Sequence, residues 1–459
     1  MFGGVILKGY GVVLGGGGAR GGYEIGVWKA LRELQIPIAA VTGTSVGALN
    51  GAMMVQGDYD IAEEIWMSVT ADSIINMENE IASAVQDKKK SMSFINTIKF
   101  MITSKGLDIT PLKELLLKVI DEEKIRRSET DLGIVTFSLT DFKPVQLFKR
   151  NIPEGKLVDY LLASACFPAF KIQEIDNKKF IDGGVYDNMP VSLIIRKNIK
   201  NIIAVDISTI ELIRKIDSKG LNIINIKNSQ DLGGILSFDS ERSKRNMEIG
   251  YYDALKAFHK YDGKKYFIIP SKDYGLYRRV YINSINLEDL KKMYSFLGLS
   301  LYRKHSSANK LIVYKIIKTI EEYTCGKLNG TTIVPAMAEI TAEQMGIPRL
   351  KAYTLNELIE KILEGYNSIK SSGDFAAYVK NVKEIVLNRN QRYYESQLKN
   401  IILEGKFLIF YNPDIDERDV KIKRFRRLIA LTFPKVCVAN LFISLMLSKR
   451  CTGDGTAQN

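Results

Sequence analysis

Two short apolar segments near the start of the chain each end in a glycine-containing turn and lead directly into a helix. Residues 11–14 stop at a run of glycines before residues 22–34, whose apolar side chains recur at helical spacing. Residues 38–41 stop at Gly43, and an apolar helix is predicted over residues 48–55. Strands that turn at once into helices are typical of parallel sheets, so these segments favour an α/β fold.

The same alternation continues through the first half of the chain. Thr110 and Pro111 form a favourable N-cap and first turn for a helix over residues 112–120. Further strands are predicted over residues 134–139, 179–181, 201–207 and 221–226. The sequence therefore predicts a largely parallel sheet with helices on both faces.

The pattern changes near residue 270. Helical periodicity dominates from residue 286 onward, with helices predicted over residues 287–297, 309–323, 355–366 and 375–387. With 459 residues, the chain is also too long for one ordinary core. We therefore predict an α/β domain over residues 1–270 and a mostly helical domain over residues 271–459.

Residues 43–47 read Gly-Thr-Ser-Val-Gly, which matches the G-x-S-x-G pattern of a nucleophile elbow. The sharp turn from strand to helix needs glycine at Gly43 and Gly47, because side chains there would obstruct it. The hydroxyl of Ser45 is then exposed at the carboxyl end of a strand, with the dipole of the next helix directed at the site. Because a strand is predicted before it and a helix after it, Ser45 is the predicted nucleophile.

The glycine run over residues 15–22 can present several backbone N–H groups toward one point and so cradle an anion. Gly16, Gly18 and Gly21 match the spacing of a dinucleotide-binding loop, but the acidic residue such a loop needs about twenty positions later is absent. No Walker lysine follows the glycines either. An oxyanion hole fits better, because the first two strand–helix turns of a parallel sheet lie at the same edge. A purely structural turn is the remaining alternative.

A nucleophilic serine needs a base, and the chain has only two histidines. His259 and His305 lie at the edge of the α/β region or beyond it, in segments typical of solvated helix residues. Asp182 is the better candidate, because it ends a predicted strand and precedes Gly183 and Gly184. An ordinary aspartate is a weak base toward an alcohol, so burial must raise its pKa. Asp-Gly is also a common structural turn.

Three segments, found in this order, resemble the patatin-like phospholipase family. They are GGGGARGGYEIGVWKAL, similar to its oxyanion segment, GTSVGALNG, similar to its elbow, and DGGVYDNMP, similar to the segment with the dyad aspartate. Residues 163–170 resemble a family stretch that lies just before that aspartate. The resemblance covers roughly residues 5–270, and the three motifs together are highly specific.

The resemblance implies a lipid acyl hydrolase, of phospholipase A or lysophospholipase type, that works through a Ser-Asp dyad without histidine. Ser45 would attack the acyl carbonyl and Asp182 would take its proton. The oxyanion segment contains Gly16, Gly17, Gly18, Arg20 and Gly21. Within it, N–H groups near Gly17 and Gly18 would hold the oxyanion, and Arg20 would brace the loop. Two alternatives are a non-lipid acyl hydrolase, such as a thioesterase or small-ester esterase, and a non-catalytic lipid-binding module.

Charge and cysteine content narrow the expected partners. The net charge of +13 suggests an anionic partner, and the absence of zinc-finger spacing or a long Arg-rich run favours a membrane surface over nucleic acid. The four cysteines lie far apart, which predicts free thiols in a reducing compartment and no metal or cofactor site. The first residues lack the pattern of a signal peptide, so we expect a cytoplasmic protein that contacts membranes peripherally.

Two further segments have open interpretations. Residues 420–450 contain eight basic and no acidic residues, and residues 428–448 approach the length of a membrane span but are interrupted by Pro434 and Lys435. A buried domain helix, a surface-associated helix and a true span are all compatible with this tail. Residues 91–104 form an amphipathic pattern that fits either a lid over the site or a plain helix packed on the sheet.

Overall fold

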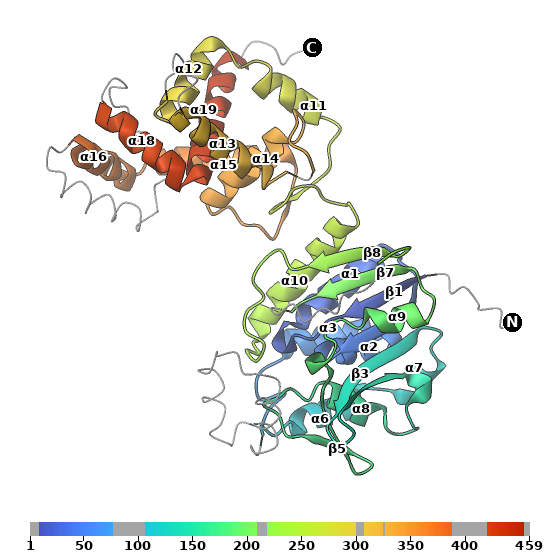
Figure 1. The fold of residues 1–459 in the computed structure, drawn as a ribbon. Coiled ribbons are helices and arrows are strands. Elements are labelled where there is room, and N and C mark those ends of the chain that lie inside the picture. Colours follow the sequence, from blue (N-terminus) through green and yellow to red (C-terminus); the bar gives the residue numbers. More distant parts are fainter. Residues whose placement is uncertain are drawn as a thin grey trace. The chain divides into compact units, whose positions relative to one another are not determined.

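The computed structural model describes residues 9–76, 106–208, 218–299, 307–324, 326–387 and 420–453. The chain divides into two compact units, Met1–Phe258 and His259–Asn459 (Figure 1). This division falls slightly before residue 270, where the sequence pattern changes. The amphipathic segment at residues 91–104 lies outside the described residues.

The first unit is built on one mixed sheet. In spatial order its main path is β5 (Gln173–Ile175), β6 (Lys178–Asp182), β3 (Asp131–Ser138), β2 (Ile38–Thr44), β1 (Tyr10–Leu14), β7 (Asn201–Asp206) and β8 (Asn222–Lys227). Five neighbouring strands of this path, β3, β2, β1, β7 and β8, run parallel to one another, as predicted. In contrast, β5, β6 and the off-path strand β4 (Lys143–Phe148) make antiparallel pairs.

Strands β2 and β6 meet end to end along one edge of β3. The other edge of β3 is occupied by β4 from Gly133 to Ser138. On the remaining edge, β2 pairs as far as Val135 and β6 takes over at Thr136. Because β2 runs parallel to β3 and β6 runs antiparallel to it, the carboxyl ends of both strands converge. This arrangement brings the residue after β2 close to the last residue of β6.

Helices cover both faces of the sheet (Figure 1). A Cβ added to Gly11 of β1 would lie 2.3 Å from Ile194 of α9 (Val191–Arg196), so α9 packs closely on one face. Leu14 points to the opposite face, because successive strand residues alternate, and lies near Gly51 of α2 (Val46–Gln56). The other described helices are α1 (Gly22–Glu33), α3 (Tyr59–Ser68), α6 (Thr110–Val119), α7 (Glu122–Arg127), α8 (Leu157–Ser164) and α10 (Ser240–Ala257).

The second unit is mostly helical, with one short pair of strands, β9 (Phe267–Ile268) and β10 (Ala352–Tyr353). Its described helices are α11 (Tyr274–Tyr277), the π-helix η4 (Arg278–Ile282), α12 (Leu287–Phe296), α13 (Ser307–Glu321), α14 (Ile333–Gln344), α15 (Leu355–Lys370), α16 (Gly373–Leu387), α18 (Val420–Thr432) and α19 (Pro434–Gly453). Capping boxes at Asn286 and Thr354 fix the starts of α12 and α15.

The apolar part of the C-terminal tail is packed inside this second unit. Cys437, Val438, Ala439 and Phe442 of α19 are completely buried in its core. Among the described residues, no single helix is long and apolar enough to cross a membrane. Only α18 together with residues 434–448 meets that test, as a pair bent by 112°. Of the three alternatives for this tail, a buried domain helix, a surface-associated helix and a membrane span, the first matches the packing of α19.

Several of the tail cations are engaged within the unit. Arg426 donates to the carbonyl of Ser295 and Arg427 to that of Gly298. Lys435 forms an ion pair with Glu343 at 3.2 Å. These side chains therefore help to hold α18 and α19 on their neighbours as well as adding positive charge.

Candidate active site

Ser45 lies in the turn between β2 and α2 with a backbone conformation that side-chain-bearing residues rarely adopt (φ 57°, ψ −129°). The turn closes only because its neighbours are glycines. A Cβ on Gly43 would lie 2.1 Å from the carbonyl oxygen of Gly47, and a Cβ on Gly47 would lie 2.4 Å from that of Leu14. The local geometry is thus that of a nucleophile elbow.

Ser164, at the end of α8, holds this elbow in place. The backbone N–H of Ser45 donates to the Oγ of Ser164 at 3.0 Å, and the Ser164 hydroxyl donates to the carbonyl of Val135 at 2.7 Å. Ser164 is fully buried, so neither bond competes with bulk water. The contribution of Ser164 was not predicted from the sequence, in which residues 163–170 were notable only for their family likeness.

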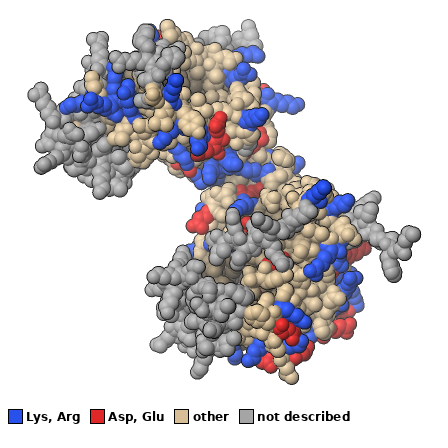
Figure 2. All heavy atoms as spheres, in the orientation of Figure 1, with Lys and Arg blue, Asp and Glu red and all other residues tan. Residues whose placement is uncertain are grey.

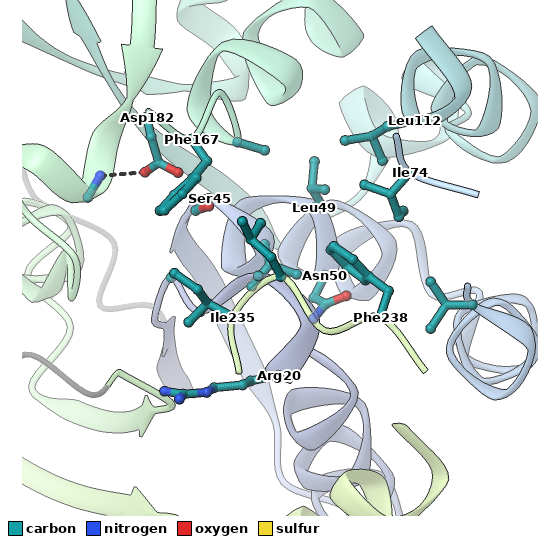
Figure 3. A pocket seen from close by; sticks show the side chains of 18 of the residues that line it. Arg20, Ser45, Leu49, Asn50, Ile74, Leu112, Phe167, Asp182, Ile235 and Phe238 are labelled. Carbon is teal, nitrogen blue, oxygen red and sulfur yellow. Dashed lines mark hydrogen bonds between the residues drawn. The ribbon is translucent and has the colours of Figure 1, made fainter. Parts of the chain in front are cut away.

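Asp182, the last residue of β6, faces the hydroxyl of Ser45 (Figure 3). Its side chain is buried, and burial raises its pKa to about 6. Hydrogen bonds from the Ser45 hydroxyl and from the Gly184 N–H, the latter at 2.7 Å, oppose this rise without cancelling it. A Cβ on Gly183 would lie 2.2 Å from the carbonyl oxygen of Val135, so this glycine lets the chain turn tightly against β3.

The glycine loop passes directly beside Ser45. A Cβ on Gly16 would lie 3.1 Å from the Cβ of Ser45. The Gly16 N–H donates to the carbonyl of Asn188, and the Ala19 N–H donates to that of Ile235. Between these two, the N–H groups of Gly17 and Gly18 bond to no residue that the structure describes.

One donor beside the serine was not anticipated from the sequence. Val46 begins α2 and lines the same cavity as Ser45. Within the described ranges its backbone N–H also has no hydrogen-bond partner. The signal for it was present, because the residue after the nucleophile commonly donates to the oxyanion in elbows of this type.

Arg20 and Gly21 shape the loop from behind. The Nε of Arg20 donates to the carbonyl of Gly233 at 2.7 Å, and its Nη1 donates to that of Ile207 at 3.2 Å. Its guanidinium lies apart from Ser45 and Asp182 in Figure 3. A Cβ on Gly21 would lie 2.5 Å from both Trp66 and Val46, so only glycine permits this packing.

Ser45 and Asp182 line a cavity of about 820 Å³. In Figure 3 the two residues lie on one side of it, and Ile74 and Leu112 lie on the other. The remaining wall is largely apolar and comes mainly from α2, α3 and α6, with Leu49, Met53, Ile65, Trp66, Leu115 and Leu116 among its residues. This size and lining suit a long hydrocarbon group.

Asn50 is a polar exception in this wall, and its side chain is fully engaged. Its Nδ2 donates to the carbonyl of Gly21 and to Glu24, and its Oδ1 accepts from the indole N–H of Trp66. Asn50 therefore joins α1, α2 and α3 beneath the cavity, with no amide atom left over for a ligand.

The histidines lie away from this cavity or outside the described residues. His259 is exposed just after α10 and does not line the cavity, whereas His305 is not among the described residues. Across the described ranges, no group of three or more His, Cys, Asp or Glu side chains converges to hold a metal ion.

The fold and the site define an α/β protein whose sheet is covered by helices on both faces and carries a nucleophile-elbow turn. More narrowly, residues 12–195 of the chain match the sequence model of the patatin-like phospholipase family.

Several proteins are similar to this chain over part of their length. It is 29% identical over 205 residues to patatin-like phospholipase domain-containing protein ZK370.4 of Caenorhabditis elegans, covering 44% of this chain and 14% of that protein. It is 30% identical over 208 residues to the neuropathy target esterase sws of Drosophila melanogaster, covering 43% and 13%. It is 27% identical over 207 residues to lysophospholipase NTE1 of Kluyveromyces lactis, covering 44% and 13%. The chain thus spans about one seventh of the length of these relatives.

Two solved structures align along most of the chain. VipD from Legionella pneumophila has a TM-score of 0.36 at 13% identity, covering 98% of this chain and 93% of that chain. The type III effector ExoU has a TM-score of 0.32 at 11% identity, covering 98% and 90%.

Proposed function

We propose that the protein is a lipid acyl hydrolase of phospholipase A or lysophospholipase type. The observation that carries the proposal is the Ser45 hydroxyl facing a buried carboxylate, Asp182, at the wall of a large apolar cavity. The match to a phospholipase family supports hydrolysis of lipid esters, and two of the similar proteins are named as an esterase and a lysophospholipase.

In the first half of the reaction, the Oγ of Ser45 attacks the acyl carbonyl and Asp182 accepts its proton. The carbonyl oxygen becomes an oxyanion, which accepts hydrogen bonds from the unused N–H groups of Gly17 and Gly18, with that of Val46 as a third donor. The intermediate then collapses, and the leaving alcohol takes the proton from Asp182. An acyl-serine and a free alcohol result.

In the second half, a water molecule replaces the alcohol and the roles repeat. Asp182 takes a proton from the water as its oxygen attacks the acyl-serine carbonyl. The second oxyanion accepts hydrogen bonds from the same N–H groups. When this intermediate collapses, Asp182 returns its proton to the Oγ of Ser45. The products are a fatty acid and the regenerated serine. The raised pKa of Asp182 suits this role, because a carboxylate of pKa about 6 is a stronger base than an ordinary aspartate.

The apolar cavity favours a long-chain substrate over the alternative of a small ester or thioester. A short acyl group would leave most of the wall formed by α2, α3 and α6 without contacts, whereas a fatty acyl chain would cover it. We propose the cytoplasm as the location, with transient contact at membranes where such lipids reside. Measuring turnover on micellar phospholipid and on a short soluble ester would distinguish these two substrate classes.

The serine assignment is tested by labelling with a fluorophosphonate probe. The Ser45→Ala variant should lose both the label and ester hydrolysis. Ser208 provides a matched control, because it also lines the cavity but its hydroxyl bonds to Asp206. The Ser208→Ala variant should keep the label. A label that persists in Ser45→Ala would show that another residue is the nucleophile.

A further inference from the structure

The net positive charge of this chain arises entirely from its second unit. Residues 1–258 contain 32 Lys and Arg and 32 Asp and Glu, whereas residues 259–459 contain 33 and 20. The whole formal net charge of +13 therefore belongs to the helical unit. A charge of this size draws a protein toward anionic surfaces, and none of it comes from the unit that holds Ser45.

Two helices of the second unit also expose apolar side chains. α13 and α18 contact each other, with the Nζ of Lys315 donating to the carbonyl of Leu431 at 2.9 Å, and both pack on α19. Their side chains that point away from this core include four large apolar residues between 38% and 61% exposed, namely Leu311, Tyr314, Ile317 and Leu428. We call these four residues, with the cations described next, the α13–α18 face.

Cations accompany the apolar residues on the same two helices. Lys310, Lys318 and Arg424 are exposed, and none of them forms an ion pair with a residue that the structure describes. α18 contains no acidic residue, and α13 contains only Glu321, at its last position. Figure 2 shows Lys and Arg atoms gathered over the region where α18 lies in Figure 1. The face is therefore both apolar and strongly cationic.

We propose that the α13–α18 face docks on the surface of an anionic phospholipid bilayer. Its apolar side chains enter the headgroup region while the cations contact lipid phosphates and carboxylates. The contact is peripheral, because the long apolar helix α19 is already buried in the core of the unit. This docking does not depend on the hydrolase function proposed for the first unit.

Other occupants fit this face less well. A second copy of the chain would bring the same cations together, and like charges without partners oppose association. A nucleic acid would satisfy the cations but would leave the four exposed apolar side chains without a complementary surface. Only a lipid surface offers negative charge and an apolar interior at the same place.

The docking is tested by sedimentation with vesicles of phosphatidylcholine alone or with a quarter phosphatidylserine. The full chain carrying Ser45→Ala is used, so that the vesicles stay intact and the result is independent of hydrolysis. We expect binding only to the phosphatidylserine vesicles, and loss of binding in 1 M salt, where screening acts within about 3 Å. Replacing Lys310, Lys318 and Arg424 with Ala should weaken binding about hundredfold, or about fivefold for each single change.

A matched set on another helix controls for general effects. α12 exposes Leu287, Leu290 and Lys291. The combined Leu287→Ser, Leu290→Ser and Lys291→Ala variant should bind like the parent, whereas Leu311→Ser with Tyr314→Ser should lose binding while keeping the parent's urea midpoint. Equal binding to neutral vesicles, or equal loss in the α12 control, would overturn the proposal. So would variants of the α13–α18 face that lose self-association in light scattering but still bind vesicles.

Discussion

Asp182 meets two opposing demands at the scale of a single residue. Burial beside Ser45 makes its carboxylate more basic, but the same burial disfavours the charged form that acts as the base in the proposed reaction. Activity and stability should therefore depend on pH in opposite directions at this residue.

The pH dependence of hydrolysis should reflect the protonation of Asp182. The proposed reaction needs the carboxylate, so kcat/KM should rise with pH through an apparent pKa near 6 and level off above it. A pH profile on a soluble ester measures this. Asp182→Asn should reduce kcat/KM by about 10²- to 10⁴-fold at neutral pH. A histidine variant, His259→Ala, should keep the parent profile, and an orders-of-magnitude loss in it would point to a triad instead.

The same Asp182→Asn variant should be more stable than the parent at neutral pH. The pKa of Asp182 is higher in the folded chain than in the unfolded one, so the parent binds this proton more tightly when folded. The contribution of this proton to the parent's free energy of unfolding is complete below pH 4 and is lost as the pH rises through the folded pKa of about 6. The neutral amide avoids this loss, a gain of up to roughly 3 kcal/mol. Urea unfolding at pH 7 and pH 4 should show the gain only at pH 7.

Ser164 is expected to act through the position of Ser45. Ser164→Ala would remove the acceptor of the Ser45 N–H and the donor to Val135, at a cost of about 1–3 kcal/mol in unfolding free energy. Relaxation of the elbow should lower kcat on the order of ten- to hundredfold with KM little changed. Ser192→Ala is the matched control, because the buried Ser192 hydroxyl bonds to no described residue. Equal kcat values for the two variants would contradict the positioning role.

At the scale of elements, the tightest constraint on the site is the elbow between β2 and α2. Gly43→Ala would place a Cβ against the carbonyl of Gly47, which is backbone and cannot move aside. We expect a loss of about 3 kcal/mol in unfolding free energy together with loss of fluorophosphonate labelling. Gly57→Ala, at the end of α2, tests the alternative that any glycine change disturbs this helix. Gly57 has a positive φ of 86° but open space around it, so its variant should lose only about 1–2 kcal/mol and keep the label.

The sequence predicted the elements of this region better than their arrangement. β1, β2, β3 and β7 were predicted because each is an apolar run bounded by turn signals. β4 and β5 were missed because the first is only partly buried and the second has three residues, so neither carries a clear pattern. Asp182 was expected at the carboxyl end of a parallel strand, but β6 is antiparallel to β3. Strand direction depends on distant pairing, which local periodicity does not encode.

The difference between local patterns and distant pairing also explains which parts of the site could be predicted from the sequence. The glycine loop, the elbow and the Asp-Gly turn are local patterns, and the structure brings Gly16, Ser45 and Asp182 together. The bond between Ser45 and Ser164 joins residues 119 positions apart, so no local pattern could indicate it.

At the scale of the whole molecule, the two units should unfold separately, because the buried cluster of the second unit contains residues only from Tyr266 onward. Phe442 is completely buried in that cluster. Phe442→Ala should lower the stability of the second unit by about 3–5 kcal/mol, while Leu428→Ala, at a half-exposed position of α18, should change it little. Hydrolysis of a soluble ester should stay at the parent level in both variants. Loss of that activity in Phe442→Ala would show that the units depend on each other.

The end-to-end meeting of β2 and β6 also determines when the proposed pair of Ser45 and Asp182 can form in a newly made chain. Ser45 leaves the ribosome 137 residues before Asp182. At ordinary rates of translation this separation corresponds to roughly 7 to 27 seconds. Throughout that interval the nascent chain presents a serine without its carboxylate, because the strand that carries Asp182 has not been added to the edge of β3. Under the proposed mechanism, any lipid that the emerging chain meets is therefore exposed to an unactivated hydroxyl.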